Sequence, residues 1–346
     1  MTKKEETRKP GVGLDIGTAF IVRAAFDEAG KEISYNTLRD AFFKVPKDEN
    51  TIEMFTRLGV SYTSDDTYLY ILGEGAIEVA NLFREKVSRP MANGVISTED
   101  NDAIDIMEVL LSKVLGKPVV EGETCIFTVP AMPLNIKDSS EFNTEYHEDK
   151  LSQIIASLGY TPKPINEALC IAYDALQDHR LTGVSCSFGA GQINIATVML
   201  GVAGRTFSII GSGDYIDSRA ANQFKMTPTQ FTKLKETADY HLVNSLKDPK
   251  IDRKIEALCL FYRRIIENAV ENLALQLKDD QPDVPPAIVI AGGTSLANGF
   301  LELFKDVVKN SSLQCGEIIL VDNPLYSVAR GALMRSSSIE AKRTKQ

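Results

Sequence analysis

Tryptophan is absent from this sequence, and histidine and cysteine are scarce: its 346 residues include three histidines and five cysteines. The histidines, His147, His179 and His241, are not spaced like a metal-binding pair, so neither a histidine metal centre nor a His-based catalytic triad is expected. The cysteines lie far apart, mostly in apolar runs, and none has metal-ligand spacing. They are typical of reduced, buried thiols, and we therefore expect a cytoplasmic protein.

Long apolar runs and an excess of positive charge are missing as well. No run approaches the roughly 18 apolar residues that a membrane span needs, and residues 1–10 are almost wholly polar, so we expect no direct membrane insertion. The net charge of -9 argues against a nucleic-acid binder, which needs a clustered positive surface. The 44% hydrophobic and 25% charged residues are those of an ordinary globular protein, and the length fits about two domains.

Alternating strand and helix patterns predict the α/β class. Apolar runs predict strands at 42–45, 68–72, 124–129 and 287–291. Apolar residues at helical spacing predict helices at 76–83, 100–115, 150–158, 167–176, 228–241 and 252–277, with another from about 298. The stretch 31–83 is interpreted as a small strand-rich subdomain closed by one helix, whereas 215–288 leaves room for helices but shows little strand pattern.

Three glycine turns each follow an apolar strand, at 15–18, 187–191 and 292–294. Glycine in such a turn lets backbone amides approach an anion, and an adjacent aspartate such as Asp15 can hold a hydrated cation. Each turn taken alone is also consistent with an ordinary hairpin. The first two lie in strand-turn-strand units of the same form, at 11–26 and 183–198, which indicates a duplicated domain.

The order of these motifs resembles that of the actin, sugar kinase and heat-shock chaperone ATPase superfamily. The segment 13–18 resembles its first phosphate motif, 187–191 its second, 165–168 its first connecting motif and 290–294 its adenosine motif. The connector at 89–96 and the closing helix at 322–332 resemble those of the prokaryotic actins of the MreB and MamK type. The resemblance implies an actin-like α/β fold, with two duplicated lobes whose central mixed sheets are flanked by helices and a nucleotide cleft between them.

The same resemblance implies four subdomains. The core of lobe I would comprise 10–35, 89–181 and 321–346, with a small subdomain at 36–88. The core of lobe II would comprise 182–217 and 279–320, with a reduced, mainly helical subdomain at 218–278.

The resemblance also implies roles for individual residues, with ATP or ADP and Mg²⁺ as ligands. Asp15 would lie near a hydrated Mg²⁺, and Glu167 would orient the water that attacks the γ-phosphate. The residues expected around the β- and γ-phosphates are Gly17, Thr18, Gly189, Ala190 and Gly191. Those expected around the adenosine are Lys235, Glu236, Gly292, Gly293 and Thr294. From the residues alone, Glu167 is also consistent with a helix-start carboxylate stabilised by the helix dipole.

The sequence departs from the pattern of the superfamily at two acidic positions. Ser187 stands where the second phosphate motif usually begins with aspartate, and Asn194 occupies a later acidic position. Asp15 would then be the main carboxylate near the metal. Because phosphoryl transfer depends on positioning and charge stabilisation, we expect ATP binding with slow hydrolysis.

The resemblance favours a prokaryotic cytoskeletal protein that binds ATP and polymerises head to tail into filaments, with an unidentified regulatory or cargo protein as a further possible partner. A non-polymerising, ATP-binding assembly adaptor of the PilM or EutJ kind is an alternative, because the second phosphate motif is weakened. A small-molecule kinase is a further alternative, although the chain is short for one and offers no convincing acidic base.

Overall fold

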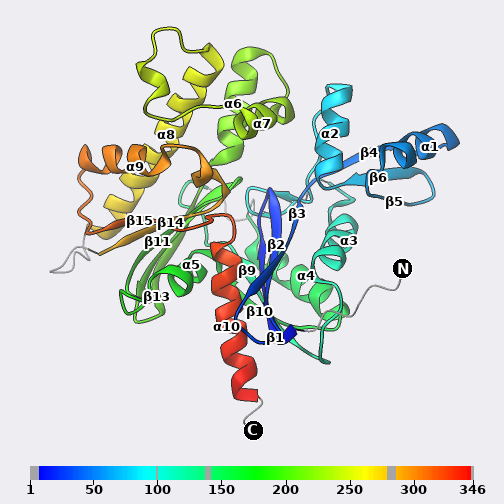
Figure 1. The fold of residues 1–346 in the computed structure, drawn as a ribbon, viewed down its shortest axis with the longest axis horizontal. Helices are drawn as coiled ribbons and strands as arrows, with labels where there is room; N and C mark the ends of the chain where they lie inside the picture. The colour runs from blue at the N-terminus through cyan, green and yellow to red at the C-terminus, as the bar shows by residue number, and fades with distance from the viewer. Residues whose placement is uncertain (1–7, 99, 137–141, 279–285, 344–346) are drawn as a thin grey trace.

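The computed structural model describes residues 8–98, 100–136, 142–278 and 286–343 (Figure 1). Residues 1–7, 99, 137–141, 279–285 and 344–346, which include parts of the predicted lobe cores, lie outside the described residues.

Two five-stranded sheets with the same topology form the centre of the molecule. The first has the order β10-β9-β1-β2-β3, and the second the order β13-β12-β11-β14-β15. In each sheet, three consecutive strands pair antiparallel as a meander. Two further strands, parallel to the first strand of the meander, continue the sheet on its other side. Their bounds are β1 Arg8–Ile16, β2 Phe20–Asp27, β3 Ile33–Arg39, β9 Thr124–Val129, β10 Thr161–Asn166, β11 Gly183–Phe188, β12 Gln192–Met199, β13 Val202–Ile210, β14 Ile288–Ala291 and β15 Ile318–Leu320. The predicted α/β class and the duplication are therefore confirmed.

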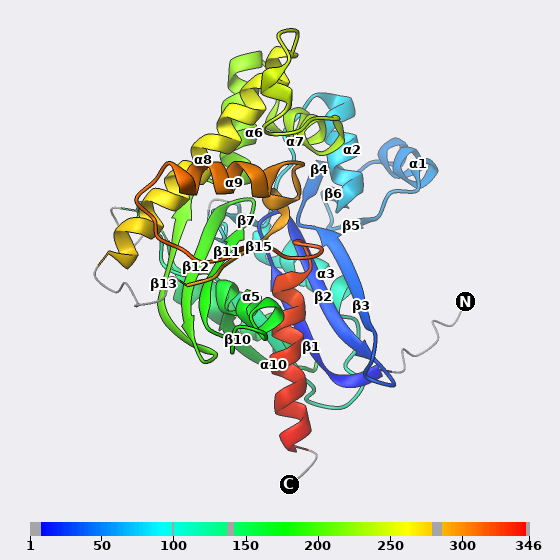
Figure 2. The same ribbon diagram turned by 60° about the vertical axis from the view of Figure 1, so that its left-hand side comes forward.

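Helices α5 (Glu167–Ala175) and α10 (Ser327–Arg343) pack between the two sheets (Figure 2). They share one hydrophobic cluster with residues of both sheets, including Ile126 of β9 and Val289 of β14. The two helices cross closely, because Gly331 lies directly against the backbone of Cys170 and leaves no room for a Cβ atom. This junction joins the first sheet, with its flanking helices (the first lobe), to the second sheet with its own (the second lobe).

A small subdomain rises from the first lobe. It contains the strands β4 (Phe42–Pro46), β5 (Tyr62–Ser64) and β6 (Tyr68–Leu72) and the helices α1 (Glu49–Leu58) and α2 (Glu74–Phe83). The prediction of a single closing helix is wrong, because α1 is a second one. Only Phe55 of α1 is buried, although Ile52, Phe55 and Leu58 recur at helical spacing; Asp48 caps the start of the helix and Gly59 its end.

Helices cover the corresponding part of the second lobe. They are α6 (Gly213–Phe224), α7 (Pro228–Thr237), the short 3-10 helix η2 (Ser245–Lys247), α8 (Arg253–Leu277) and α9 (Phe300–Lys309). Residues 218–278, all of them described, contain helices and no strand. The long helix α8 buries an apolar stripe in the core of the second lobe, as its periodicity predicts.

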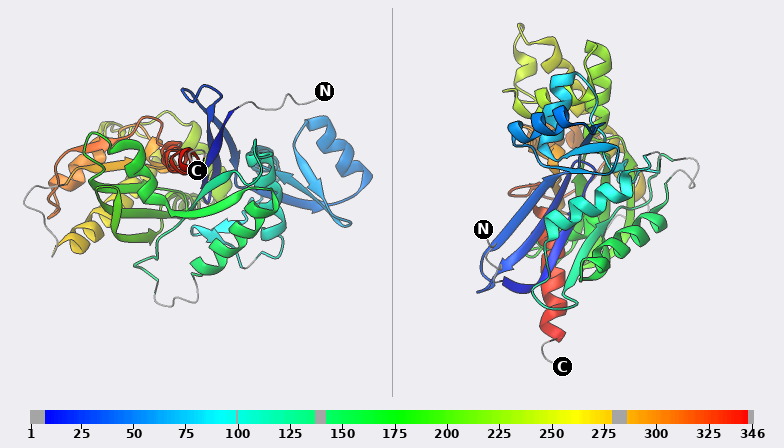
Figure 3. Two further views of the ribbon diagram at one scale, coloured as in Figure 1. Left: turned by 90° about the horizontal axis from the view of Figure 1, so that it is seen from below. Right: turned by 90° about the vertical axis from the view of Figure 1, so that its right-hand side faces the viewer.

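The remaining described elements complete the first lobe. Helices α3 (Ala103–Leu115) and α4 (Thr144–Ser157) cover one face of the first sheet (Figure 3). Between the small subdomain and α3, the connector forms the two-residue strands β7 (Met91–Ala92) and β8 (Val95–Ile96). Helix α4 begins six residues before its predicted start, where the side chain of Asn143 accepts a hydrogen bond from the amide of Tyr146.

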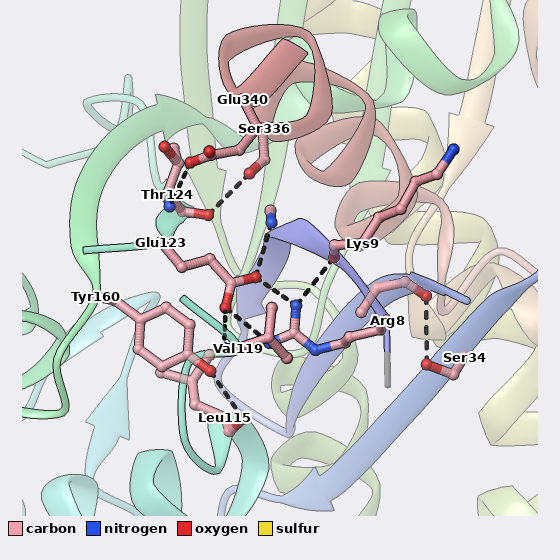
Figure 4. A network of polar contacts seen from close by, with 12 residues as sticks. Arg8, Lys9, Ser34, Leu115, Val119, Glu123, Thr124, Tyr160, Ser336 and Glu340 are labelled. Carbon is pink, nitrogen blue, oxygen red and sulfur yellow. Dashed lines mark hydrogen bonds and ion pairs between the residues drawn. The ribbon is translucent and has the colours of Figure 1, made fainter. Parts of the chain in front are cut away.

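A buried ionic network holds the start of β1 and the C-terminal half of α10 to the first lobe (Figure 4). The guanidinium of Arg8 pairs with Glu123, which also accepts hydrogen bonds from the amides of Gly11 (2.7 Å) and Val119 (2.9 Å). The backbone of the next residue, Thr124, is bonded to two side chains of α10: its amide donates to Glu340, and its carbonyl accepts from the hydroxyl of Ser336. Such saturation of a buried carboxylate offsets its desolvation cost.

Among the described residues, no helix combines the length and apolar character that crossing a membrane requires.

Candidate functional site

A cavity of about 320 Å³ lies between the two lobes, and every site residue predicted from the sequence lines it. The turn β1-β2 and the start of α5 line it from the first lobe and the junction. The turn β11-β12, the short helix η3 (Gly293–Leu296) and the end of α7 line it from the second lobe. The residues are Asp15, Gly17, Thr18, Glu167, Gly189, Ala190, Gly191, Lys235, Glu236, Gly292, Gly293 and Thr294. Ser187, at the first departure from the family pattern, lines the cavity too.

The first two turns are built alike. The amide of Gly17 donates to the carbonyl of Phe20 (3.0 Å), and the amide of Gly189 donates to that of Gln192 (3.1 Å). Each bond closes the tip of a hairpin whose strands come from a separate sheet. The two tips therefore face the same cavity from opposite lobes because the two sheets have the same topology.

The third turn is fastened to the second. Gly292 has a φ of 94° and lies against the backbone of Phe188, so a side chain at this position would be strained and would clash. The hydroxyl of Thr294 donates to the carbonyl of Gly189 (2.7 Å). The backbone of the third turn is thereby held at the end of β11, beside the second hairpin tip.

Three carboxylates line the cavity, and two of them, Asp15 and Glu167, influence each other. Burial, together with the charge of Glu167, holds the pKa of Asp15 well above its usual range, although Thr128 donates a hydrogen bond to Oδ1 (3.2 Å). Burial also raises the pKa of Glu167 to about 7. Asp15 therefore has a second carboxylate close enough to influence its titration, which the sequence did not reveal.

Asn194 connects Glu167 to the first lobe. Its Nδ2 donates to Oε2 of Glu167 (2.7 Å), and its Oδ1 accepts from the amide of Ala131 (3.0 Å). Asn194 is completely buried. In the sequence this residue was interpreted only as a missing carboxylate, whereas in the structure it fixes the orientation of the predicted catalytic residue.

Lys235 and Glu236 line the cavity, but their charged ends are bonded to protein groups. Nζ of Lys235 lies 2.7 Å from Oδ2 of Asp217, and the carboxylate of Glu236 accepts two hydrogen bonds from Arg39. Tyr262 of α8 also lines the cavity. Tyr262 lies within the helix predicted at 252–277, and no local signal in the sequence distinguished it from a core residue.

The described residues contain no cluster of three or more His, Cys, Asp or Glu side chains arranged to hold a metal ion. Asp15 and Glu167 could hold a cation only with further ligands from water or from a bound anion.

Two duplicated sheets, with helices between them, and an interlobe cavity lined by three turns define an actin-like fold. Solved structures show the same fold. The chain is similar to the MamK double helical filament, with 19% identity, a TM-score of 0.71 and coverage of 94% of this chain and 98% of the other. It is similar to MreB 5 of Spiroplasma citri bound to AMPPNP, with 17% identity, a TM-score of 0.66 and coverage of 97% and 98%. For the ethanolamine utilization protein EutJ from Carboxydothermus hydrogenoformans, these values are 15%, 0.57, and 95% and 92%.

The chain belongs to the volactin family, whose model matches residues 11–336. A search among curated proteins returned no significant match.

Proposed function

We propose that this protein is a cytoskeletal actin-like protein that binds ATP with Mg²⁺ between its lobes and assembles head to tail into filaments. The observation that carries the proposal is the convergence of every predicted site residue on one interlobe cavity. Those residues come from segments of the chain as far apart as Asp15 and Thr294, so their meeting is not a consequence of sequence proximity. We propose with it the four-part division of the lobes predicted from the sequence.

The lining of the cavity fits a nucleotide phosphate chain. Because the amides of Gly17 and Gly189 close their own hairpins, the amides of the neighbouring residues Thr18 and Ala190 would carry the contacts to phosphate. The adenosine would lie towards Gly292, Gly293 and Tyr262. The related fold of MreB 5, solved with the ATP analogue AMPPNP, supports this assignment.

The donor set also fits a divalent cation. Asp15 and Glu167 are carboxylates in one buried wall, and their mutual repulsion would be relieved by a cation between Asp15 and the phosphates. Bound Mg²⁺ would supply charge neutralisation for the terminal phosphates. Asp15 would hold its hydration water, since oxygen ligands and retained waters are typical of Mg²⁺.

The residues of the same cavity wall lead us to expect slow hydrolysis of ATP. Glu167, oriented by Asn194, would accept a hydrogen bond from the attacking water. Ser187 and Asn194 are uncharged at positions that are usually acidic in the superfamily, so water and metal would be held with less negative charge. We therefore expect turnover well below that of fast actin ATPases.

Head-to-tail assembly is supported by the resemblance to MamK, which was solved as a double helical filament. The non-polymerising adaptor remains a second candidate, because EutJ has a similar fold over 95% of this chain.

Sedimentation and negative-stain microscopy with ATP, ADP and no nucleotide test the proposal. Filaments that depend on ATP and Mg²⁺ are expected, and Asp15→Ala should abolish both nucleotide binding, measured by calorimetry, and assembly. Binding of ATP without polymers under any condition of salt and nucleotide would favour the adaptor instead. Unaltered assembly of the Asp15→Ala variant would contradict the assignment of the cavity.

A further inference from the structure

Arg39 lies at the end of β3 in the first lobe and reaches across to the second. Its side chain is 4% exposed. Nη1 and Nη2 donate to Oε1 (2.9 Å) and Oε2 (2.7 Å) of Glu236 on α7, and Nε donates to Oε2 of Glu74 (3.1 Å). Arginine presents donors in a planar fork that matches a carboxylate, so the pair with Glu236 is the stronger of these contacts.

One partner of this ion pair lines the cavity, and the other contacts a residue that does. Glu236 lines it from the second lobe, and the guanidinium of Arg39 lies 4.2 Å from the ring centroid of Phe20, which lines it from the first. The pair therefore closes the rim of the cavity between two lobes. Opening the lobes at this rim requires the two hydrogen bonds to break.

The bidentate pair leaves part of the carboxylate free for a ligand. Each carboxylate oxygen has two lone pairs, and Arg39 uses one on each oxygen of Glu236. The remaining lone pairs of Glu236 can accept from the hydroxyls of a sugar. Without Arg39, the Glu236 side chain would regain its rotamer freedom and its carboxylate would no longer be fixed in the wall.

We propose that Arg39 is a positioning residue of the nucleotide site: it holds Glu236 towards the ribose and clasps the lobes over the bound nucleotide. This inference rests on the proposed binding of ATP in the cavity. Release of the nucleotide then requires the Arg39–Glu236 pair to open, so the pair sets the rate of nucleotide exchange.

Other contacts between the lobes remain when the clasp is removed. Arg89 of the connector pairs with Asp214 at the start of α6 (2.7 Å), and the amide of Val87 donates to the hydroxyl of Thr229 (3.1 Å). A variant at Arg39 is therefore expected to fold and to keep its lobes joined. Its effect should fall on the exchange of nucleotide rather than on the fold.

The test measures release of a fluorescent ATP analogue, chased with excess unlabelled ATP, from the full-length chain. Arg39→Gln, which keeps amide donors but loses the charge and the fork, should release the analogue about tenfold faster than wild type. Arg39→Lys should release the analogue at a rate between those of the wild type and Arg39→Gln. Arg57→Gln is the matched control, because Arg57 pairs with Glu53 on the exposed surface of α1, and it should release at the wild-type rate.

Thermal unfolding without nucleotide checks that the Arg39→Gln variant is folded, and small-angle scattering of the same samples reports whether its lobes separate further. Faster release with an intact fold supports the inference. Release from Arg39→Gln at the wild-type rate overturns it and leaves the proposed function standing. Failure of the wild-type chain to bind the analogue overturns both, and is seen before any variant is compared.

Discussion

At the residue scale, Asn194 has the clearest consequence, because its Nδ2 donates a hydrogen bond to Oε2 of Glu167 (2.7 Å). Asn194→Asp replaces that donor with a carboxylate, and two like charges in contact raise the pKa of at least one of them. Either the pKa of Glu167, about 7 beside Asn194, or that of the introduced aspartate should therefore rise. Titration of the carboxyl carbons by NMR in the nucleotide-free protein measures this. Asn50→Asp, at an exposed site on α1, is the control. If Glu167 in Asn194→Asp titrates as in the wild type and the introduced aspartate titrates in its usual range, the assigned contact is contradicted.

His147 predicts a pH dependence of stability. It is completely buried on α4; Nδ1 accepts from the amide of Ile96 (3.2 Å), and burial lowers its pKa to about 4. The unfolded chain, with a histidine pKa near 6.5, binds the proton more readily than the native state, so this stabilisation is present above about pH 6.5 and is lost as the pH falls towards 4.

From pH 7 to pH 5, His147 becomes protonated in the unfolded chain but stays largely neutral in the native state. This difference should lower the free energy of unfolding by about 2 kcal/mol. Urea denaturation at both pH values measures it. His147→Gln can still accept the Ile96 amide but does not titrate, so the variant should lose that part of the pH dependence. An equal pH dependence in wild type and variant would show that another group is responsible.

At the element scale, the packing of α10 against α5 depends on Gly331, whose Cα faces the backbone of Cys170. Gly331→Ala improves helix propensity but forces the two helices apart, and overpacking of this kind costs about 1–3 kcal/mol. Chemical denaturation should reveal that loss. Ser338→Ala, on the exposed face of the same helix, isolates the effect of propensity and should be neutral or slightly stabilising. A Gly331→Ala variant as stable as wild type would mean that the helices shift without cost.

The elements also show how far the sequence alone could go. Strands such as β9 and β11 and the long helix α8 have strong apolar patterns, and their positions were predicted within a few residues. Helix α1 was missed although Ile52, Phe55 and Leu58 recur at helical spacing, because the whole stretch 31–83 was interpreted as strand-rich and closed by one helix.

The candidate site, like the helices and strands, was predicted only in part from the sequence. The turns that line it are local motifs, so their residues were found from the sequence. Arg39, Thr128 and the bonding of Asn194 were not, because each acts through a partner more than 25 residues away in the chain, as with Glu167 and Asn194, 27 residues apart. Such contacts depend on strand pairing and lobe packing, which a single sequence does not specify.

At the scale of the whole molecule, apolar side chains are exposed at two separate ends. Met199, Leu200 and Val202, 68–70% exposed, form the β12-β13 turn at the end of the second sheet away from the cavity. Leu82 and Phe83 are exposed at the end of α2, which rises at the upper side of the molecule in Figure 1. Different patches at different ends are what a heterologous, open-ended assembly requires.

Leu200 provides the sharpest test of that arrangement. It adopts a φ of 50°, a left-handed conformation that leucine disfavours and asparagine tolerates. Leu200→Asn should therefore preserve or slightly raise the melting temperature, while it removes an apolar contact of the proposed filament and raises the critical concentration for sedimentation several-fold. Leu260→Asn, which removes an exposed leucine from the side of α8, should leave assembly unchanged. Equal critical concentrations for the wild-type chain and Leu200→Asn would exclude the β12-β13 turn from the contact between subunits.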